Sequence, residues 1–325
     1  AGILEDMPRL DYSGSCPALL LEPQRSNILP YSELINTSTY YITNSTQEQF
    51  AGTSPDGSNT ATKVTSTGYT IFRPFGALTL STSTTYTFTF YAKNIDASGA
   101  WFRVYNASAG SNLVNTTSYF NQLTIGEWVR VEYTFTTTAT DTLYYPYLQD
   151  GNQGGSILYW GAQLEAGSYP TSYIPTYGSS VTRSRDNASI VNSSIPNASQ
   201  GTIFCEYKMI EVFNGPELKS GGNRVVFYGR GNTAQMTYIV ARDGVEIVRE
   251  NPVISGLNTN ENNKYAFTWS LDGYALYING VKEESGDLSN VPSALTEIRI
   301  YDVIKQFALF PTALTDSECI ALTTI

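Results

Sequence analysis

The sequence predicts an all-β protein with two β-sandwich (jelly-roll) domains in tandem, an extended N-terminal leader and a short C-terminal helical turn. Its 325 residues exceed what one hydrophobic core organises, since domains average roughly 150 residues. Only 15% of the residues are charged, against about 25% in typical soluble proteins. Threonine and tyrosine, which fit a pleated and half-buried surface, take their place. Short alternating runs separated by Gly, Asn, Ser and Asp complete the pattern of a sandwich.

Residues 1–30 are predicted to form the extended leader. Prolines stand at Pro8, Pro17, Pro23 and Pro30. Each proline blocks a continuous helix and biases its neighbour towards extended backbone. We therefore expect this segment to lie along a neighbouring domain or chain.

The first predicted domain spans residues 31–177. Large apolar side chains alternate with threonine at Tyr86, Phe88 and Phe90, and the period recurs at Val129, Val131, Tyr133 and Phe135. A period of two places such side chains on one face of a strand. A further apolar run, residues 157–164, precedes the turn-forming residues 165–168. These runs predict successive short strands.

Residues 178–200 are rich in Ser, Asn and Pro and are predicted to be the linker to a second domain, residues 201–325. Three dipeptides in that domain supply the positive φ angles of tight hairpins: Asp243-Gly244, Asp272-Gly273 and Asn279-Gly280. They predict a three-stranded meander over residues 264–271, 274–278 and 281–285. Its first strand is expected to turn four side chains inward: Tyr265, Phe267, Trp269 and Leu271.

A capping box is predicted near the end of the chain, where Thr315 precedes Glu318 by three residues. In this motif the hydroxyl accepts from the third amide while the carboxylate reaches back. A short helical turn is therefore expected at residues 319–322.

Composition excludes several classes of function. The chain has no histidine, which removes histidine-based triads and histidine-ligated zinc. A net charge of −10 disfavours nucleic acid as a partner, because nucleic-acid binders present basic patches. No apolar stretch approaches the roughly 18 residues that cross a bilayer, so membrane insertion is not expected. Cys16, Cys205 and Cys319 have no close spacing and are interpreted as buried thiols.

Several strings resemble segments of bacteriophage tail and structural proteins. They are residues 8–12, 19–27 and 31–33, then 55–57 with 60–63, and finally 160–165 with 169–176. The resemblance implies that residues 31–177 form a jelly roll similar to carbohydrate-binding modules. Residues 277–280 and 308–318 give the second domain a resemblance to laminin-G or concanavalin-like lectin sandwiches, which is a fold signal and not a function.

These resemblances imply a virion surface protein, such as a tail or head fibre, that binds glycans on the host surface. Other virion proteins and further copies of the chain, as a homotrimer, are the expected partners. Two alternatives stay open: a structural capsid-decoration or tail-assembly protein without a glycan ligand, and a polysaccharide depolymerase. Catalysis is disfavoured because the sequence has no Glu-x-Asp triplet, so it lacks the paired acids that one type of lectin-like glycosidase places on a strand.

Glycan sites combine aromatic rings, which stack on sugar C–H faces, with polar groups that fix the hydroxyls. The candidates are Trp101, Tyr105, Tyr144, Tyr145, Tyr147 and Gln149 in the first domain, and Arg230, Asn232, Tyr238 and Arg242 in the second. Packing in the core or on a sheet is the alternative for the rings, and salt bridges or solvation are the alternative for the charges. Tyr144 and Tyr145 are consecutive, so on a strand they must face opposite ways.

No cofactor is expected, with calcium as the one exception considered. Oxygen ligands cluster around Asp56 and around Asp150 with Asn152. Neither cluster matches a twelve-residue calcium loop with its closing glutamate. Asp-Gly turns are the simpler interpretation of both.

Overall fold

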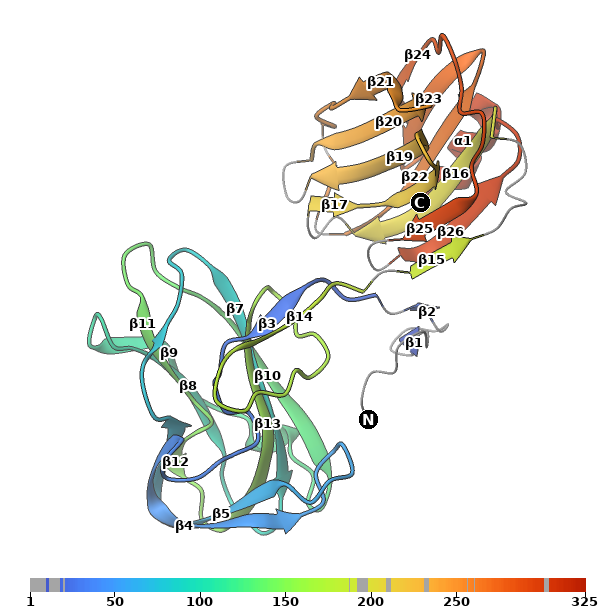
Figure 1. Cartoon of the computed structure of the whole chain (residues 1–325). Helices are drawn as coiled ribbons and strands as arrows, with labels where there is room; N and C mark the ends of the chain where they lie inside the picture. The colour runs from blue at the N-terminus through green and yellow to red at the C-terminus, as the bar shows by residue number, and fades with distance from the viewer. Residues whose placement is uncertain are drawn as a thin grey trace. The chain divides into compact units, whose positions relative to one another are not determined.

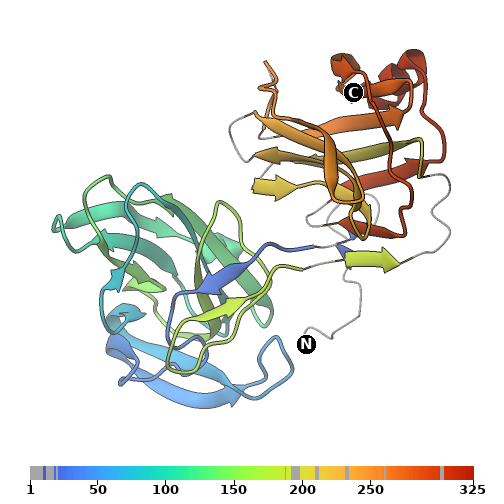
Figure 2. The same cartoon turned by 45° about the horizontal axis from the view of Figure 1, so that its top comes forward.

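The protein is described by a computed structural model that covers residues 10–11, 18–19, 21–186, 188–191, 198–208, 212–230, 234–255, 257–259, 261–300 and 304–325. Two compact units emerge, Gln24–Ser184 and Arg185–Ile325, and the described part of residues 6–23 groups with the second. Each unit is built from layered strands, blue to yellow-green in the first and yellow to red in the second (Figures 1 and 2). The prediction of an all-β fold made of sandwiches is confirmed.

The first unit packs two antiparallel sheets against each other. The larger has the order β10-β7-β13-β5-β12, with β4 also paired to β5: β4 (Tyr40–Gly52), β5 (Ala61–Pro74), β7 (Thr85–Asn94), β10 (Trp128–Thr136), β12 (Gln149–Asn152) and β13 (Ser156–Ala166). The smaller has the order β6-β11-β8-β9: β6 (Leu78–Thr79), β8 (Trp101–Asn106), β9 (Ser111–Ser118) and β11 (Leu143–Tyr147). A single 3-10 turn, Phe120–Gln122, interrupts the strands.

The core of the first unit lies between these sheets. Tyr86, Phe88 and Phe90 are all buried, as the alternation predicts. Thr87 and Thr89, on the opposite face of β7, are also buried. The strand is therefore covered on both faces, because chain segments beyond the sheets pack over its threonine side.

The ends of the first unit lie further out in the chain than the sequence predicts. β3 (Arg25–Asn27), inside the predicted leader, pairs with β14 (Val181–Arg183), inside the predicted linker. Leu29 is fully buried in the first core. The leader prediction of 1–30 and the linker prediction of 178–200 therefore both include residues that belong to the first unit, since prolines and serines there do not prevent pairing of short extended segments.

Asn27 anchors the incoming chain to the sheet. Its amide nitrogen donates to the carbonyl oxygens of Ala162 (3.1 Å) and Ile174 (2.9 Å). Its amide oxygen accepts from the backbone nitrogens of Leu29 (3.2 Å) and Leu164 (3.1 Å). All four hydrogen bonds are buried, so one side chain satisfies backbone groups of three separate segments.

A second buried polar cluster follows on β13. Glu165, which is fully buried, accepts hydrogen bonds from the Gln163 amide (2.7 Å) and from the backbone nitrogen and hydroxyl of Thr171 (2.8 and 2.7 Å). Burying a carboxylate in this way requires donors on its oxygens. Glu165 still belongs to β13, so the turn predicted over residues 165–168 begins later, near Gly167 with its φ of +144°.

The second unit is also a pair of antiparallel sheets. One has the order β15-β25-β18-β19-β20-β21, with β17 paired to β19: β15 (Ala188–Val191), β17 (Val212–Asn214), β18 (Pro216–Ser220), β19 (Asn223–Arg230), β20 (Met236–Arg242), β21 (Val245–Glu250) and β25 (Glu297–Ile300). The other has the order β24-β23-β22-β16-β26: β16 (Gly201–Lys208), β22 (Asn262–Ser270), β23 (Gly273–Ile278), β24 (Val281–Gly286) and β26 (Ile304–Phe310). A two-residue pair, β1 (Leu10–Asp11) with β2 (Ala18–Leu19), groups with this unit.

The meander predicted for the second unit is present as β22, β23 and β24. Tyr265, Phe267 and Trp269 are buried, but Leu271 is 66% exposed. The prediction for Leu271 is wrong because β22 ends at Ser270, and the turn that follows takes Leu271 out of the strand's alternation.

Two of the three predicted hairpin dipeptides have positive φ at both residues. The angles are 51° and 86° at Asp243-Gly244, and 49° and 84° at Asn279-Gly280, as tight hairpins require. At the third, Gly273 alone is in the positive region, with φ of 128°. That turn has a different geometry from the other two.

The chain ends in α1 (Asp316–Thr323), which is longer than the predicted turn at 319–322. Its capping box is confirmed: Glu318 N donates to the Thr315 hydroxyl, and Thr315 N donates to the Glu318 carboxylate. Cys319 lies on the buried side of this helix and Cys205 lies in the core, both as free thiols. Cys16 lies outside the described residues. In the described part of the chain, no helix has the length and apolar character needed to cross a membrane.

Candidate functional site

The outer face of β8 carries aromatic and cationic side chains. Phe102 and Val104 are fully buried and point into the core. Trp101, Arg103 and Tyr105 alternate with them and are only half-buried. The period of two in a strand therefore places these three side chains together on the outside of the smaller sheet.

The neighbouring strand β11 adds two tyrosines to this face. Tyr145 lies opposite Tyr105 in the register, and Tyr147 lies opposite Arg103. The guanidinium carbon of Arg103 stands 4.1 Å from the centre of the Tyr147 ring and 5.5 Å from that of Tyr105. These are cation–π distances, which hold the rings and the cation in fixed relative positions.

The larger sheet continues the same face through β4 and β5. Tyr41 lies opposite Arg73 in the register of these strands. The guanidinium carbon of Arg73 is 3.9 Å from the Tyr145 ring centre, 4.5 Å from Tyr41 and 5.8 Å from Tyr147. The two sheets therefore share one continuous surface. Below, the arginine–tyrosine face means Tyr41, Arg73, Trp101, Arg103, Tyr105, Tyr145, Tyr147 and Asp150.

Asp150 supplies the negative charge of the face. It lies on β12, is 2% exposed, and its carboxylate stands 3.0 Å from Nε of Arg103 and 3.1 Å from the Thr116 hydroxyl. A buried carboxylate needs such partners. Burial and then the charge of Asp150 raise the pKa of Tyr69, whose hydroxyl donates to the Asp150 carbonyl oxygen at 3.3 Å.

Trp101 lies against two glycines. A Cβ at Gly99 would come 2.0 Å from the indole, and a Cβ at Gly151 would come 2.6 Å from it. The backbone nitrogen of Trp101 donates to the side-chain oxygen of Gln149 at 3.1 Å. The ring therefore has a fixed position because glycine at both sites leaves room for it.

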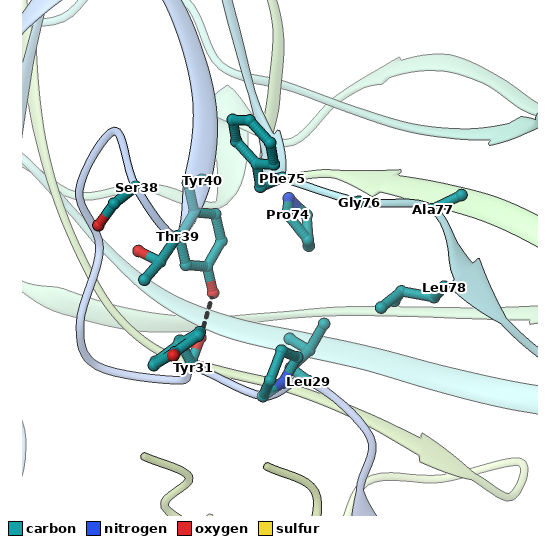
Figure 3. Close-up of a pocket in the computed structure, with 11 residues that line it drawn as sticks. Leu29, Tyr31, Ser38, Thr39, Tyr40, Pro74, Phe75, Gly76, Ala77 and Leu78 are labelled. Carbon is teal, nitrogen blue, oxygen red and sulfur yellow. Dashed lines mark hydrogen bonds between the residues drawn. The ribbon is translucent and has the colours of Figure 1, made fainter. Parts of the chain in front are cut away.

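A pocket of about 220 Å³ opens where β4 begins and β5 ends (Figure 3). Its lining comprises Leu29, Pro30, Tyr31, Ser38, Thr39, Tyr40, Pro74, Phe75, Gly76, Ala77 and Leu78. Within it, the Tyr40 hydroxyl donates to the carbonyl oxygen of Tyr31 at 2.6 Å. Nη1 of Arg73 donates to the carbonyl oxygens of Pro74 (2.9 Å) and Phe75 (3.1 Å). Arg73 thereby links the arginine–tyrosine face to the wall of this pocket.

Four candidates predicted from the sequence of the first domain lie on this face: Trp101, Tyr105, Tyr145 and Tyr147, although Tyr147 is only 7% exposed. Tyr144 and Gln149 are fully buried and offer no surface to a ligand. The Tyr144 hydroxyl accepts a hydrogen bond from the backbone nitrogen of Thr138 (3.0 Å). The Gln149 side chain on β12 accepts a hydrogen bond from the backbone of β8. As expected for neighbours on a strand, Tyr144 and Tyr145 face opposite ways.

The candidates in the second domain do not form a comparable surface. Tyr238 is 1% exposed and belongs to the core. Arg242 is bound to the side chains of Asn290 (2.6 Å) and Asp243 (3.3 Å). The backbone of Arg230 ends β19, but its side chain and the whole of Asn232 lie outside the described residues.

Two of the three calcium candidates, Asp56 and Asp150, already have partners in the structure. Asp56 accepts hydrogen bonds from Ser54 and Ser58 within its turn. Partial burial acts to raise the pKa of Asp56, but these hydrogen bonds outweigh it and lower the pKa. Asp150 faces the Arg103 cation, and Asn152 is exposed on β12. No group of three or more acidic or cysteine side chains suited to a metal occurs among the residues described, and calcium binding stays a prediction.

The sequence did not single out Tyr41, Arg73 or Arg103. Arg103 stands between Trp101 and Tyr105 at a spacing of two, and this pattern could have identified it. Arg73 and Tyr41 had no such signal, since Arg73 reaches the face through the packing of β5 beside β11, and Tyr41 reaches it through the pairing of β4 with β5.

No protein-family model matches the chain, and no curated protein matches it. Among solved structures, the CBM40 of the Ruminococcus gnavus IT-sialidase is 16% identical, over 39% of this chain and 84% of that one, with a TM-score of 0.35. The NanB sialidase of Streptococcus pneumoniae is 14% identical, over 42% of this chain and 27% of that one, with a TM-score of 0.34. The CBM22-1 and GH10 modules of Clostridium thermocellum xylanase 10B are 9% identical, over 46% of this chain and 30% of that one, with a TM-score of 0.33. The chain thus spans less than a third of the last two structures.

Proposed function

We propose that the chain is a non-enzymatic glycan-binding protein whose ligand lies on the arginine–tyrosine face of the first unit. The observation that carries the proposal is the gathering of Tyr41, Tyr105, Tyr145 and Trp101 around two arginines on one outer surface. Aromatic rings pack on the C–H faces of sugars, and guanidinium groups donate to their hydroxyls. Since the cation–π contacts already fix these side chains, little conformational entropy is lost when a ligand binds.

The electrostatics of the face favour binding over hydrolysis. Glycosidases use two carboxylates roughly 5 to 9 Å apart, one of which gives or takes a proton. Asp150 is buried and ion-paired with Arg103 at 3.0 Å, so this carboxylate is engaged by the protein's own side chains and is not presented to a substrate. The Glu165 carboxylate is also buried, and it accepts three hydrogen bonds in the interior of the first unit.

The proposal extends to the biological setting: the chain is part of a virion appendage that attaches to glycans of the host surface. The strings at residues 8–12, 19–27, 160–165 and 169–176, which resemble those of phage tail proteins, support this setting. Repetition of weak sites, as in a homotrimer beside other virion proteins, would add factors of about 10² to 10⁴ in avidity without any new contact.

Labelling of intact particles tests the setting. Antibodies raised against the purified chain are expected to decorate a fibre or tail tip in electron micrographs. The matched control is the same antibody after absorption with the chain. Labelling confined to capsid facets would replace adhesion with capsid decoration, and particles that take no label would remove the virion setting.

Replacing Tyr145 with Ala tests the face itself. The change removes the ring nearest the Arg73 guanidinium, so binding to the best glycan of an array is expected to weaken about tenfold. Titration calorimetry with that glycan measures the change. Tyr177→Ala, at a 71% exposed tyrosine of the same unit outside the face, should bind as the parent does. If the two variants bind the glycan with equal affinity, the binding site lies outside this face. An array on which no glycan binds the chain would refute the proposal.

A further inference from the structure

The two arginines of the arginine–tyrosine face differ in their charge balance. Arg103 stacks on Tyr147 and is neutralised by Asp150, 3.0 Å from its Nε. Arg73 stacks on Tyr145 and Tyr41, and among the described residues no carboxylate lies within ion-pair distance of it. The net positive charge of this face is therefore concentrated at Arg73.

The guanidinium of Arg73 is held in place by its neighbours, and one of its edges is available to a ligand. Its Nη1 is used by the carbonyl oxygens of Pro74 and Phe75. Its Nε and Nη2 make no hydrogen bond within the described part of the chain, and neither is among the buried side-chain atoms found there without a hydrogen-bond partner. These two nitrogens consequently reach solvent while the rings of Tyr41 and Tyr145 hold the plane of the group.

An edge of this kind suits an oxyanion. Nε and Nη2 of arginine form a planar fork that donates two parallel hydrogen bonds to a carboxylate or a sulfate. The chain as a whole carries a net charge of −10, so general attraction does not bring anions to it. Arg73, a fixed cation without an ion-pair partner among the described residues, is therefore suited to a local contact with an anion.

We infer that Arg73 forms an anion subsite on the arginine–tyrosine face, and that the glycan bound there carries a carboxylate or sulfate group. This inference rests on the proposed function, because it assigns the chemical class of that same ligand. The aromatic rings around Arg73 contact the sugar, and the guanidinium edge selects its acidic substituent.

Matched sugar pairs test the inference on the full chain. The probes are a galacturonic acid trisaccharide with its methyl ester, and sulfated lactose with lactose, so that the two arms separate carboxylate from sulfate. The parent chain is expected to prefer the acidic member of one pair, with a preference that falls as salt rises. Arg73→Gln is expected to weaken binding of that member about 10-fold to 100-fold and binding of its neutral partner by a smaller factor, so that the preference for the acidic sugar falls.

Lys63→Gln is the matched control, since it removes one positive charge from the same strand, β5, outside the face. It should keep the preference for the acidic sugar. Thermal unfolding establishes that the variants are folded; if Arg73→Gln is not, Arg73→Lys takes its place, and its compact ammonium is expected to give a smaller preference than the arginine fork.

The outcomes separate the two proposals. Equal binding of acidic and neutral sugars by the parent, or an undiminished preference in Arg73→Gln, overturns the anion subsite and leaves glycan binding in place. Loss of the preference for acidic sugars in Lys63→Gln also overturns the anion subsite, because the overall charge of the chain would then cause that preference. A parent chain that binds none of these sugars and no glycan on an array overturns the proposed function, and the subsite with it.

Discussion

Asn27→Ala is expected to lower the free energy of unfolding of the first unit by about 4 kcal/mol, since each buried polar group left unpaired costs roughly 1–3 kcal/mol. Four backbone groups lose their partner in this variant: the carbonyls of Ala162 and Ile174 and the amides of Leu29 and Leu164. Urea unfolding followed by hydrogen exchange in peptides of β7 and β13 measures the first unit separately from the second.

Ser26→Ala is the control for this variant, because Ser26 is the neighbouring residue on β3. Its hydroxyl meets only the exposed hydroxyl of Thr182, at 2.6 Å, so its loss should change stability by less than about 0.5 kcal/mol. If both variants unfold at the parent's urea concentration, the Asn27 network does not close the first unit.

The Asn27 network gives a physical reason for the strings that resemble segments of phage tail proteins. Residues 25–27 lie far in sequence from residues 160–165 and 169–176, yet Asn27, Gln163 and Glu165 satisfy buried backbone groups among these strings. Substitution at these positions would leave donors or acceptors unpaired. The strings therefore describe how the sandwich is closed, and they do not by themselves identify a ligand.

Strand positions in the first unit could be predicted because alternation is local. Tyr86, Phe88 and Phe90 faced inward as expected, but the same alternation cannot show what covers the other face of the strand. Thr87 and Thr89 are buried there, with their hydroxyls bonded to the Gly167 carbonyl (2.9 Å) and the Arg130 guanidinium (3.1 Å). Those contacts come from segments distant in the sequence. The local pattern of threonines therefore predicted a half-exposed face on β7, where the structure has a buried one.

The candidate site was predictable in part for the same reason. Trp101 and Tyr105 share a strand, so their common face follows from a spacing of two. Arg73 reaches the site only through the packing of β5 beside β11, and a single sequence does not give that long-range arrangement. The rings could be proposed from local pattern, whereas the cation that gives the face its charge could not.

Trp269→Ala is expected to destabilise the second unit by about 4 kcal/mol, within the range of roughly 3–5 kcal/mol for loss of a large buried aromatic side chain. The Trp269 side chain is 1% exposed, its indole nitrogen donates to the Ala198 carbonyl oxygen at 3.1 Å, and a Cβ at Gly201 would come 2.5 Å from the ring. Urea unfolding followed by hydrogen exchange in peptides of β16 and β22 measures the loss.

Leu271→Ala is the matched control, because alternation in the sequence assigns Leu271 to the same inward face as Trp269. The side chain is 66% exposed, and substitutions at such surface positions usually change stability by no more than about 0.5 kcal/mol. Equal losses in the two variants would mean that β22 continues past Ser270 in solution. A large loss in Trp269→Ala alone would show that the turn at Asp272-Gly273, and not the alternation, decides which side chains enter the second core.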